Sequence, residues 1–279
     1  MPSPPPRSRR TVAGIRPVVF IGAIIVLAWI GVSSAGAARL SALLRMVDRE
    51  QAAHPNALWH IVNDLCVPDM KVSGNPAPCA QVNLTGGYAV VKDVARKTQY
   101  LLIPTQRVSG IESPELLTPA SPNYWQAAWT ARRLIERQLG RPLPRADIGL
   151  AINALVGRTQ NQLHIHIDCV RPGVQHALQI HEAQIGPHWS DLDFTLAGGR
   201  YRARWISGED LGANDPFKLL ADGDPIARVD MADETLVLIA ASRLDGAPGF
   251  VLLSDRADPS RGDIGAGEGL LDHSCRVLS

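Results

Sequence analysis

Polar and apolar side chains alternate strictly over residues 161–169, which read Asn-Gln-Leu-His-Ile-His-Ile-Asp-Cys. A period of two is typical of a half-buried β-strand, so alternate side chains should project from opposite faces. One face would carry Gln162, His164, His166 and Asp168, and the other Leu163, Ile165, Ile167 and Cys169. Packing does not require a row of imidazole, amide and carboxylate groups. The pattern therefore indicates a reactive or binding surface.

Two imidazoles on one strand face suit three kinds of role. His164 and His166 could hold a zinc ion together with a third ligand from elsewhere in the chain. One imidazole could instead attack phosphorus while its neighbours orient it. Both could also be structural histidines that form hydrogen bonds on a polar face. The spacing alone favours none of the three.

The polar segment before this strand shifts the balance towards phosphate chemistry. It combines amide, guanidinium and hydroxyl groups with backbone N–H groups near Gly157. Such donors suit phosphate oxygens, whereas metal ions prefer carboxylates and imidazoles. Taken by itself, the segment is explained more simply as a polar hairpin turn. Its candidate substrate-binding residues are Asn153, Arg158, Thr159, Gln160 and Asn161.

Hydrophobic periodicity and turn residues predict the strands that hold the site. Strands are expected at 88–92, 99–103, 147–152, 201–206, 235–241 and 249–253. Because a short turn joins 147–152 to 161–169, these two strands should pair antiparallel.

The predicted helices complete an α+β class. They cover residues 39–65, Asn123 to Leu139, and 216–221. The Ser121-Pro122 pair should start the central helix and Gly140 should end it, with Trp125 and Trp129 facing the core. We expect an antiparallel sheet with helices on one face, followed by a C-terminal α+β extension.

The N-terminal segment is predicted to be a membrane anchor. Residues 1–16 form a basic tip with four arginines, and residues 17–38 carry no charge. About 20 apolar residues can cross a bilayer, and arginines before them favour an N-terminus inside. A cleaved signal peptide with Ala35-Gly36-Ala37 as its site is the weaker alternative, because Trp29 and the length favour an anchor. Either way, residues 39–279 should be exported.

The four cysteines fit an exported domain. An even number in an oxidising compartment suggests two disulfides, and four cysteines allow three pairings. We expect the pairs Cys66–Cys79 and Cys169–Cys275, against the alternative of four reduced thiols. No C-x-x-C spacing is present, so the cysteines do not indicate a zinc site. A formal charge of +1 over 279 residues also gives no reason to expect nucleic-acid binding.

The segment from Asn153 to Ile167 resembles the histidine triad superfamily of nucleotidyl hydrolases and transferases, whose motif is a run of alternating histidines at the end of a hairpin. Nearly all of the exported portion is similar to the membrane-anchored CDP-diacylglycerol pyrophosphatases. Together the shared motifs are specific. After the anchor they comprise Cys66, Pro78-Cys79, Gly87-Tyr88, 99–105, 110–114, 157–161, 164–167 and 272–275.

The resemblance implies a role for each matching residue. The nucleophile of the triad falls on His164, and the last histidine, which bonds a phosphate oxygen or supports the leaving group, falls on His166. The first histidine falls on Gln162, which is a departure. An amide cannot shuttle a proton as an imidazole does, although it can orient a neighbour by hydrogen bonding. Asn153 matches the asparagine on the phosphate side before the loop. Arg158 stands where the superfamily often has glutamine, and Thr159 matches the hydroxyl position that follows.

The activity implied by the resemblance is hydrolysis of CDP-diacylglycerol to CMP and phosphatidate, without a metal or other cofactor. The implied fold is a histidine-triad-like antiparallel sheet. The implied setting is a single pass through a bacterial inner membrane, with the catalytic domain on the periplasmic side and the lipid substrate and bilayer as partners. Two alternatives stay open: a nucleotide-binding or nucleotidyl-transfer protein of the same fold, and a zinc hydrolase using His164 and His166.

Overall fold

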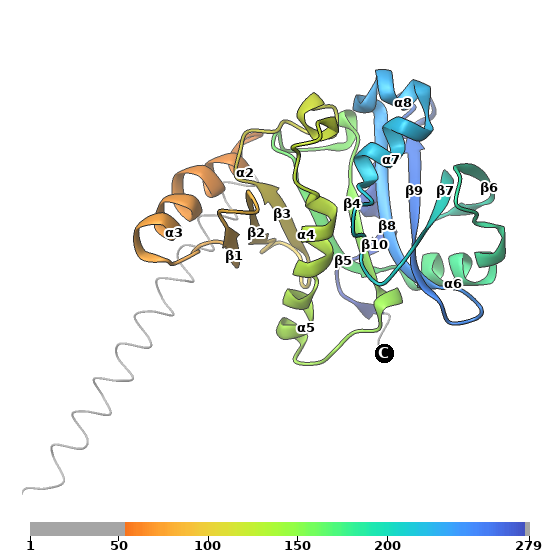
Figure 1. Ribbon diagram of the computed structural model, residues 1–279, viewed down its shortest axis with the longest axis horizontal. Coiled ribbons are helices and arrows are strands. Elements are labelled where there is room, and N and C mark those ends of the chain that lie inside the picture. The colour runs from red at the N-terminus through yellow and green to blue at the C-terminus, as the bar shows by residue number, and fades with distance from the viewer. Residues whose placement is uncertain (1–53, 277–279) are drawn as a thin grey trace, which may run out of the picture. The chain divides into compact units, whose positions relative to one another are not determined.

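The computed structural model describes residues 54–276, which form an antiparallel sheet with helices packed against it (Figure 1). The strands run in the spatial order β1-β2-β3-β5-β4-β8-β9-β7-β6, and β10 pairs with β5. Their bounds are β1 Gln81–Asn83, β2 Tyr88–Lys92, β3 Tyr100–Pro104, β4 Ile148–Ile152, β5 Ile165–Val170, β6 Ser190–Leu196, β7 Gly199–Ser207, β8 Glu234–Ser242, β9 Pro248–Arg256 and β10 Leu271–Asp272.

The helices of the described part are short. They are α2 Ala57–His60, a π-helical stretch Ile61–Cys66, α3 Val67–Ser73, α4 Tyr124–Ala131, α5 Arg133–Leu139, α6 Pro172–Ile180, α7 Pro216–Gly223 and α8 Pro225–Val229. Single 3₁₀ turns cover Pro114–Leu117, Arg145–Asp147, Leu155–Gly157, Glu182–Gln184, Met231–Asp233, Pro259–Arg261 and Gly267–Leu270.

The basic tip at 1–16 and the membrane anchor at 17–38 lie outside the described residues, as does the beginning of the helix predicted at 39–65. Among residues 54–276, none of the helices combines the length and the apolar character that a membrane span requires.

Strand β5 carries His166 and Asp168 and lies within the sheet and not at its edge. It begins at Ile165, so the strand predicted over 161–169 is shorter at its start, and Gln162 and His164 come directly before it. It pairs antiparallel with β4, as predicted, and Ala151 lies opposite His166. Along its other side it pairs first with β3, where Leu101 lies opposite His166, and then with β10, where Asp272 lies opposite Cys169. Strand β8 pairs with β4, so the C-terminal strands continue this sheet and do not form a separate extension.

Helices cover both faces of the sheet, so the prediction of helices on one face is wrong. On one face, α4 and α7 bury Trp125, Trp129 and Phe217 against the strands. On the other, α2 and the π-helical stretch pack on β2 and β3, whereas α6 packs on the strands beyond β4. The reason lies in strands such as β3, where the successive residues Leu101 and Leu102 are both buried. Such strands present apolar side chains in both directions, and both faces need a cover.

The long helix predicted from Asn123 to Leu139 is interrupted at Arg132. Its start and end agree with the prediction, since the Asn123 side chain accepts a hydrogen bond from the Gln126 N–H and Gly140 adopts a φ of 70° at the C-cap. At the break, Nη1 of Arg132 donates to the Trp129 carbonyl at 2.6 Å, and its guanidinium stacks 3.8 Å from the Trp129 ring. The same carbonyl accepts the backbone N–H of Arg132 at 3.4 Å, a 3₁₀-type contact, and the segment divides here into α4 and α5.

Both predicted disulfides are confirmed. Cys66 joins Cys79, with Cα atoms 5.7 Å apart, and Cys169 joins Cys275 across a sequence separation of 106 residues. The first ties the helical segment to the loop before β1. The second ties the segment after β10 to β5, next to the polar row.

Removing the second disulfide should destabilise the protein more than removing the first. In the chain-entropy model, a cross-link closing a loop of about 15 residues contributes about 3 kcal/mol, and one closing about 100 residues about 4.7 kcal/mol. We expect Cys169→Ala/Cys275→Ala to lower the free energy of unfolding by more than Cys66→Ala/Cys79→Ala. Urea unfolding of the three proteins tests this, and an equal or reversed order would contradict it.

Candidate active site

The polar side chains that alternate from 162 to 168, called the polar row here, are buried along β5 and just before it. They lie at the boundary between the two apolar clusters on their face of the sheet. The neighbouring Leu101 belongs to the cluster under α2, and Ala151 belongs to the cluster under α6. The polar row comprises Gln162, His164, His166 and Asp168, with exposed fractions between 0% and 7%. Each polar atom there needs a partner from the protein or from a ligand.

His164 is held as one defined tautomer by its own chain. Its Nδ1 lies 2.8 Å from the backbone carbonyl oxygen of Gln162. A carbonyl oxygen can only accept, so Nδ1 carries the proton and Nε2 carries the lone pair. Burial lowers the pKa of His164, which keeps the imidazole neutral. The arrangement leaves a neutral, oriented imidazole whose Nε2 lone pair is available to react.

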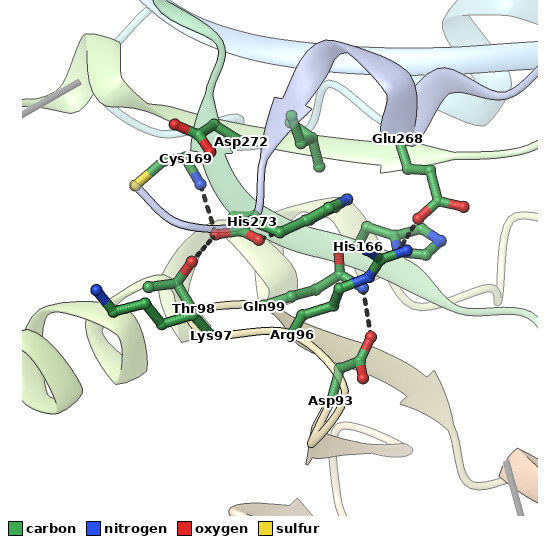
Figure 2. A network of polar contacts seen from close by, with 12 residues as sticks. Asp93, Arg96, Lys97, Thr98, Gln99, His166, Cys169, Glu268, Asp272 and His273 are labelled. Atoms are coloured by element: carbon green, nitrogen blue, oxygen red, sulfur yellow. Dashed lines mark hydrogen bonds and ion pairs between the residues drawn. The ribbon is translucent and has the colours of Figure 1, made fainter. Parts of the chain in front are cut away.

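His166 lies beside His164 and faces a carboxylate. The rings of His164 and His166 meet edge to face, with centroids 4.9 Å apart. Nδ1 of His166 lies 3.5 Å from Oε2 of Glu268, and Figure 2 shows these two side chains facing each other. At that distance the contact is an ion-pair approach and not a regular hydrogen bond. Burial lowers the pKa of His166 to about 3 despite this carboxylate. His166 is therefore neutral at physiological pH.

Glu268 is a site residue that the sequence did not indicate. It comes from the 3₁₀ turn Gly267–Leu270, and its Oε1 accepts a hydrogen bond from Nδ2 of Asn153 at 3.0 Å. Its backbone N–H donates in return to Oδ1 of Asn153 at 3.1 Å. The carbonyl of Gly265 fixes the same turn by accepting from the Ala154 N–H at 2.9 Å. The cluster of glycines at 262–269 was the available signal for a close backbone approach.

A cavity of about 260 Å³ opens onto these groups. Three of the predicted substrate-binding residues line it, namely Asn153, Thr159 and Gln160. The loop between β2 and β3 supplies further wall residues that the sequence did not indicate. The complete lining is Leu58, Asp93, Ala95, Arg96, Gln99, Leu101, Asn153, Thr159, Gln160, His164, His166 and Glu268.

Gln162 holds a loop and does not line this cavity. Its Nε2 donates to the carbonyls of Pro104 and Gln106 at 3.1 and 2.8 Å, and its Oε1 accepts from the Val108 N–H at 3.3 Å. The side chain is fully buried. Because the Gln162 amide nitrogen and oxygen are both used in these hydrogen bonds, the side chain suits the expected role of orienting a neighbouring segment and does not suit proton transfer.

Arg158, Gln160 and Asn161 also make contacts that position neighbouring segments. Nη1 of Arg158 approaches both carboxylate oxygens of Glu112, at 2.9 and 2.7 Å. Gln160 accepts from the Leu58 N–H at 3.2 Å, and the Asn161 backbone N–H donates to the Pro55 carbonyl at 2.5 Å. Arg158 and Asn161 do not line the cavity, so their substrate-binding assignment stays a prediction.

Asp168, the last polar residue of the row, organises the far side of the site. Its carboxylate accepts from the Thr98 hydroxyl at 2.6 Å and from the Cys169 N–H at 2.9 Å, and Nδ1 of His273 lies 2.9 Å from its other oxygen. Figure 2 shows Thr98, Cys169 and His273 gathered in this network. Burial raises the pKa of Asp168, against the lowering effect of these hydrogen bonds. The network connects the loop before β3 to the segment after β10.

This geometry is suited to phosphoryl or nucleotidyl transfer, because a neutral, oriented histidine lies next to a second imidazole, in a cavity with amide, hydroxyl and guanidinium donors. Comparison with known proteins agrees. The family model described as CDP-diacylglycerol pyrophosphatase matches residues 53–279, and the chain belongs to that family. One relative, the CDP-diacylglycerol pyrophosphatase of Yersinia pestis, is 44% identical over 226 residues, which cover 81% of this chain and 86% of that protein.

The buried His166 should make the protein less stable in acid. Its pKa is about 3 in the folded state and 6.5 as a reference value, so the unfolded chain binds the proton first as the pH falls. Its contribution to the free energy of unfolding is therefore intact above pH 6.5 and is lost by up to about 1.4 kcal/mol per pH unit below it. Urea unfolding from pH 7 to 4 should show a shallower pH dependence for His166→Asn. The exposed His176→Asn is the matched control and should keep the wild-type slope.

Proposed function

We propose that this protein hydrolyses CDP-diacylglycerol to CMP and phosphatidate, with His164 as the nucleophile. Family membership supports the substrate and the bond that is cleaved. The observation that carries the mechanism is the hydrogen bond from Nδ1 of His164 to the Gln162 carbonyl, because it leaves the Nε2 lone pair free to react. This fits the histidine-triad-like mechanism expected from the sequence.

The reaction would proceed in two displacements at the cytidylyl phosphorus. In the first, Nε2 of His164 forms a P–N bond, the P–O bond to the second phosphate breaks, and phosphatidate leaves with the electron pair. In the second, water attacks the same phosphorus, the P–N bond breaks, and CMP is released with transfer of a proton to solvent. The donors of Asn153, Thr159 and Arg96 around the cavity suit the charge on the phosphate oxygens.

His166 would support the first displacement from beside the nucleophile. Its ring is neutral, so one nitrogen donates and the other accepts. If Nδ1 of His166 carries the proton and faces the Glu268 carboxylate, Nε2 is a hydrogen-bond acceptor. If Nε2 carries the proton instead, it can donate a hydrogen bond to a phosphate oxygen. Asn153 fixes the carboxylate through its two hydrogen bonds to Glu268, which limits how far this pair can turn.

The zinc alternative has weaker support in this geometry. Within residues 54–276, the one group of three potential ligand atoms within 4.8 Å of one another is Asp168, Cys169 and Cys275, and its two sulfurs form a disulfide. The nucleotide-binding alternative shares the same site and differs only in turnover. Incubation with CDP-diacylglycerol and assay of released CMP separates turnover from binding. Metal analysis of the purified protein tests the zinc alternative.

We also propose that the catalytic domain lies outside the cytoplasm, anchored by residues 17–38 in a bacterial inner membrane. The two disulfides support an oxidising compartment. A diacylated substrate stays in the bilayer, so an anchor would confine enzyme and substrate to the same surface and raise their effective concentration.

Loss of the nucleophile should abolish turnover without loss of the fold. We expect His164→Asn, whose amide can retain a donor near the Gln162 carbonyl, to lower kcat by at least about 10⁴-fold, as removal of nucleophiles does elsewhere. CMP release measures the rate, and mass analysis of a rapidly quenched wild-type reaction should find a cytidylyl group on His164. Wild-type turnover by this variant would rule out the mechanism.

The acid limb of the pH profile should lie lower than that of an ordinary histidine. Protonation removes the Nε2 lone pair, so activity falls as His164 becomes charged. Burial lowers its pKa below 6.5, and the neutral form persists to correspondingly lower pH. A plot of kcat/KM against pH should therefore begin its acid decline below pH 6.5. A decline centred above that value would contradict a buried, neutral nucleophile.

A further inference from the structure

A second and larger cavity of about 690 Å³ adjoins the first. The two share the wall residues Ala95 and Arg96, and the Arg96 side chain extends towards His166 in Figure 2. The lining of this basic cavity is Ala95, Arg96, Lys97, Arg171, Pro172, Leu271, Asp272, His273, Ser274 and Arg276. Neither the motif resemblance nor the proposed chemistry at His164 assigns it a role.

The wall of the basic cavity has an excess of positive charge. Arg96 and Lys97 come from the loop before β3, Arg171 from the start of α6, and Arg276 from the segment after β10. Four cationic side chains from three separate segments thus converge on one hollow. This convergence is unlike a basic run along one helix, where the charges would point in different directions.

The one carboxylate in this wall does not cancel the excess. Asp272 accepts hydrogen bonds from the Ser274 N–H at 3.1 Å, the Ser274 hydroxyl at 2.7 Å and the Arg276 N–H at 2.7 Å. It is 6% exposed, and Nε of Arg276 lies 3.7 Å from it. Asp272 therefore shapes the turn that presents Arg276, and its single negative charge leaves the wall with a net positive charge.

The segments that carry these cations are held together rigidly. The buried Asp168 carboxylate binds both Thr98, next to Lys97, and His273, in the wall itself. The Cys169–Cys275 disulfide fixes the residue before Arg276 to β5. A charged hollow whose parts are fixed in this way is preorganised for an anion.

We propose that the basic cavity binds the phosphate monoester headgroup of an anionic phospholipid, in this case the phosphatidate half of the substrate. This assignment rests on the proposed function, because it gives the leaving phosphate a place beside the phosphorus attacked by His164. Arg96, which lines both cavities, would contact the bridging phosphates. The wall has only three apolar residues, Ala95, Pro172 and Leu271, so it suits a headgroup and leaves the acyl chains outside.

The test measures binding of a product, so it does not depend on turnover. Titration calorimetry of the full-length protein with water-soluble dihexanoyl phosphatidate should show saturable binding. The variant Lys97→Gln/Arg276→Gln should weaken that binding at least about tenfold, since two charge-assisted contacts are lost. CMP binding in the first cavity should change little.

The matched control removes two positive charges elsewhere. Arg133→Gln/Arg141→Gln alters exposed residues that do not line the basic cavity, and it should leave phosphatidate affinity within about twofold. Equal weakening by the two double variants would overturn the proposal, because it would reflect net charge alone. Dihexanoyl phosphatidylcholine, a diester, should bind at least tenfold more weakly, and inorganic phosphate as tight as phosphatidate would overturn the lipid assignment.

The outcome for the basic cavity is separable from that for hydrolysis. Phosphatidate binding that depends on Lys97 and Arg276 would support the cavity even if no CMP were released. CMP release by a wild-type protein that does not bind phosphatidate here would support the hydrolysis and reject the cavity assignment.

Discussion

Polar side chains buried inside a sheet need partners, and this requirement at β5 organises the rest of the site. Gln162 forms hydrogen bonds with backbone groups of residues 104–108, and His164 with the backbone carbonyl of Gln162. Asp168 forms hydrogen bonds with the side chains of Thr98 and His273. These partners come from segments before β3, after β3 and after β10. The hydrogen-bond partners that these buried side chains require therefore bring three loops around the strand, and these loops enclose the two cavities.

The same requirement explains which side chains remain available for chemistry. Arg158 is occupied by Glu112, and Gln162 is occupied by backbone carbonyls, so neither is presented to the cavity. His164 keeps one nitrogen free because only its Nδ1 is used. The polar row thus separates into residues that hold the site together and residues that face a ligand.

The sequence predicted local features of the fold well and distant ones poorly. The alternation at 161–169 predicted a strand that is observed from Ile165 onwards, with His166 and Asp168 on it. The turn and capping residues around Asn123 and Gly140 marked a helix correctly at both ends. The interruption at Arg132 was missed, because it depends on a side chain stacking on Trp129. The packing of helices on both faces of the sheet was also missed, because no local sequence pattern indicates which helix will pack against a given strand.

Residues that reach the site from far along the chain were the hardest to predict. Glu268 has an ordinary sequence context and becomes a site residue only because the turn at Gly267 approaches the end of β4. Arg96 lies in a polar loop with nothing to distinguish it from a solvated residue. In contrast, the two disulfides were predicted, because only three pairings were possible and the spacings favoured one of them.

Two of the contacts that close the site join residues more than a hundred positions apart in the chain. His273 reaches Asp168 across 105 residues, and Glu268 reaches Asn153 across 115. Contacts between such distant residues close large loops, and the loss of chain entropy on closure opposes their formation. The histidine strand is synthesised before these partners, so its polar side chains can form these contacts only after residues 265–276 have been synthesised. The reactive surface is therefore complete only when residues 265–276 are in place on the sheet.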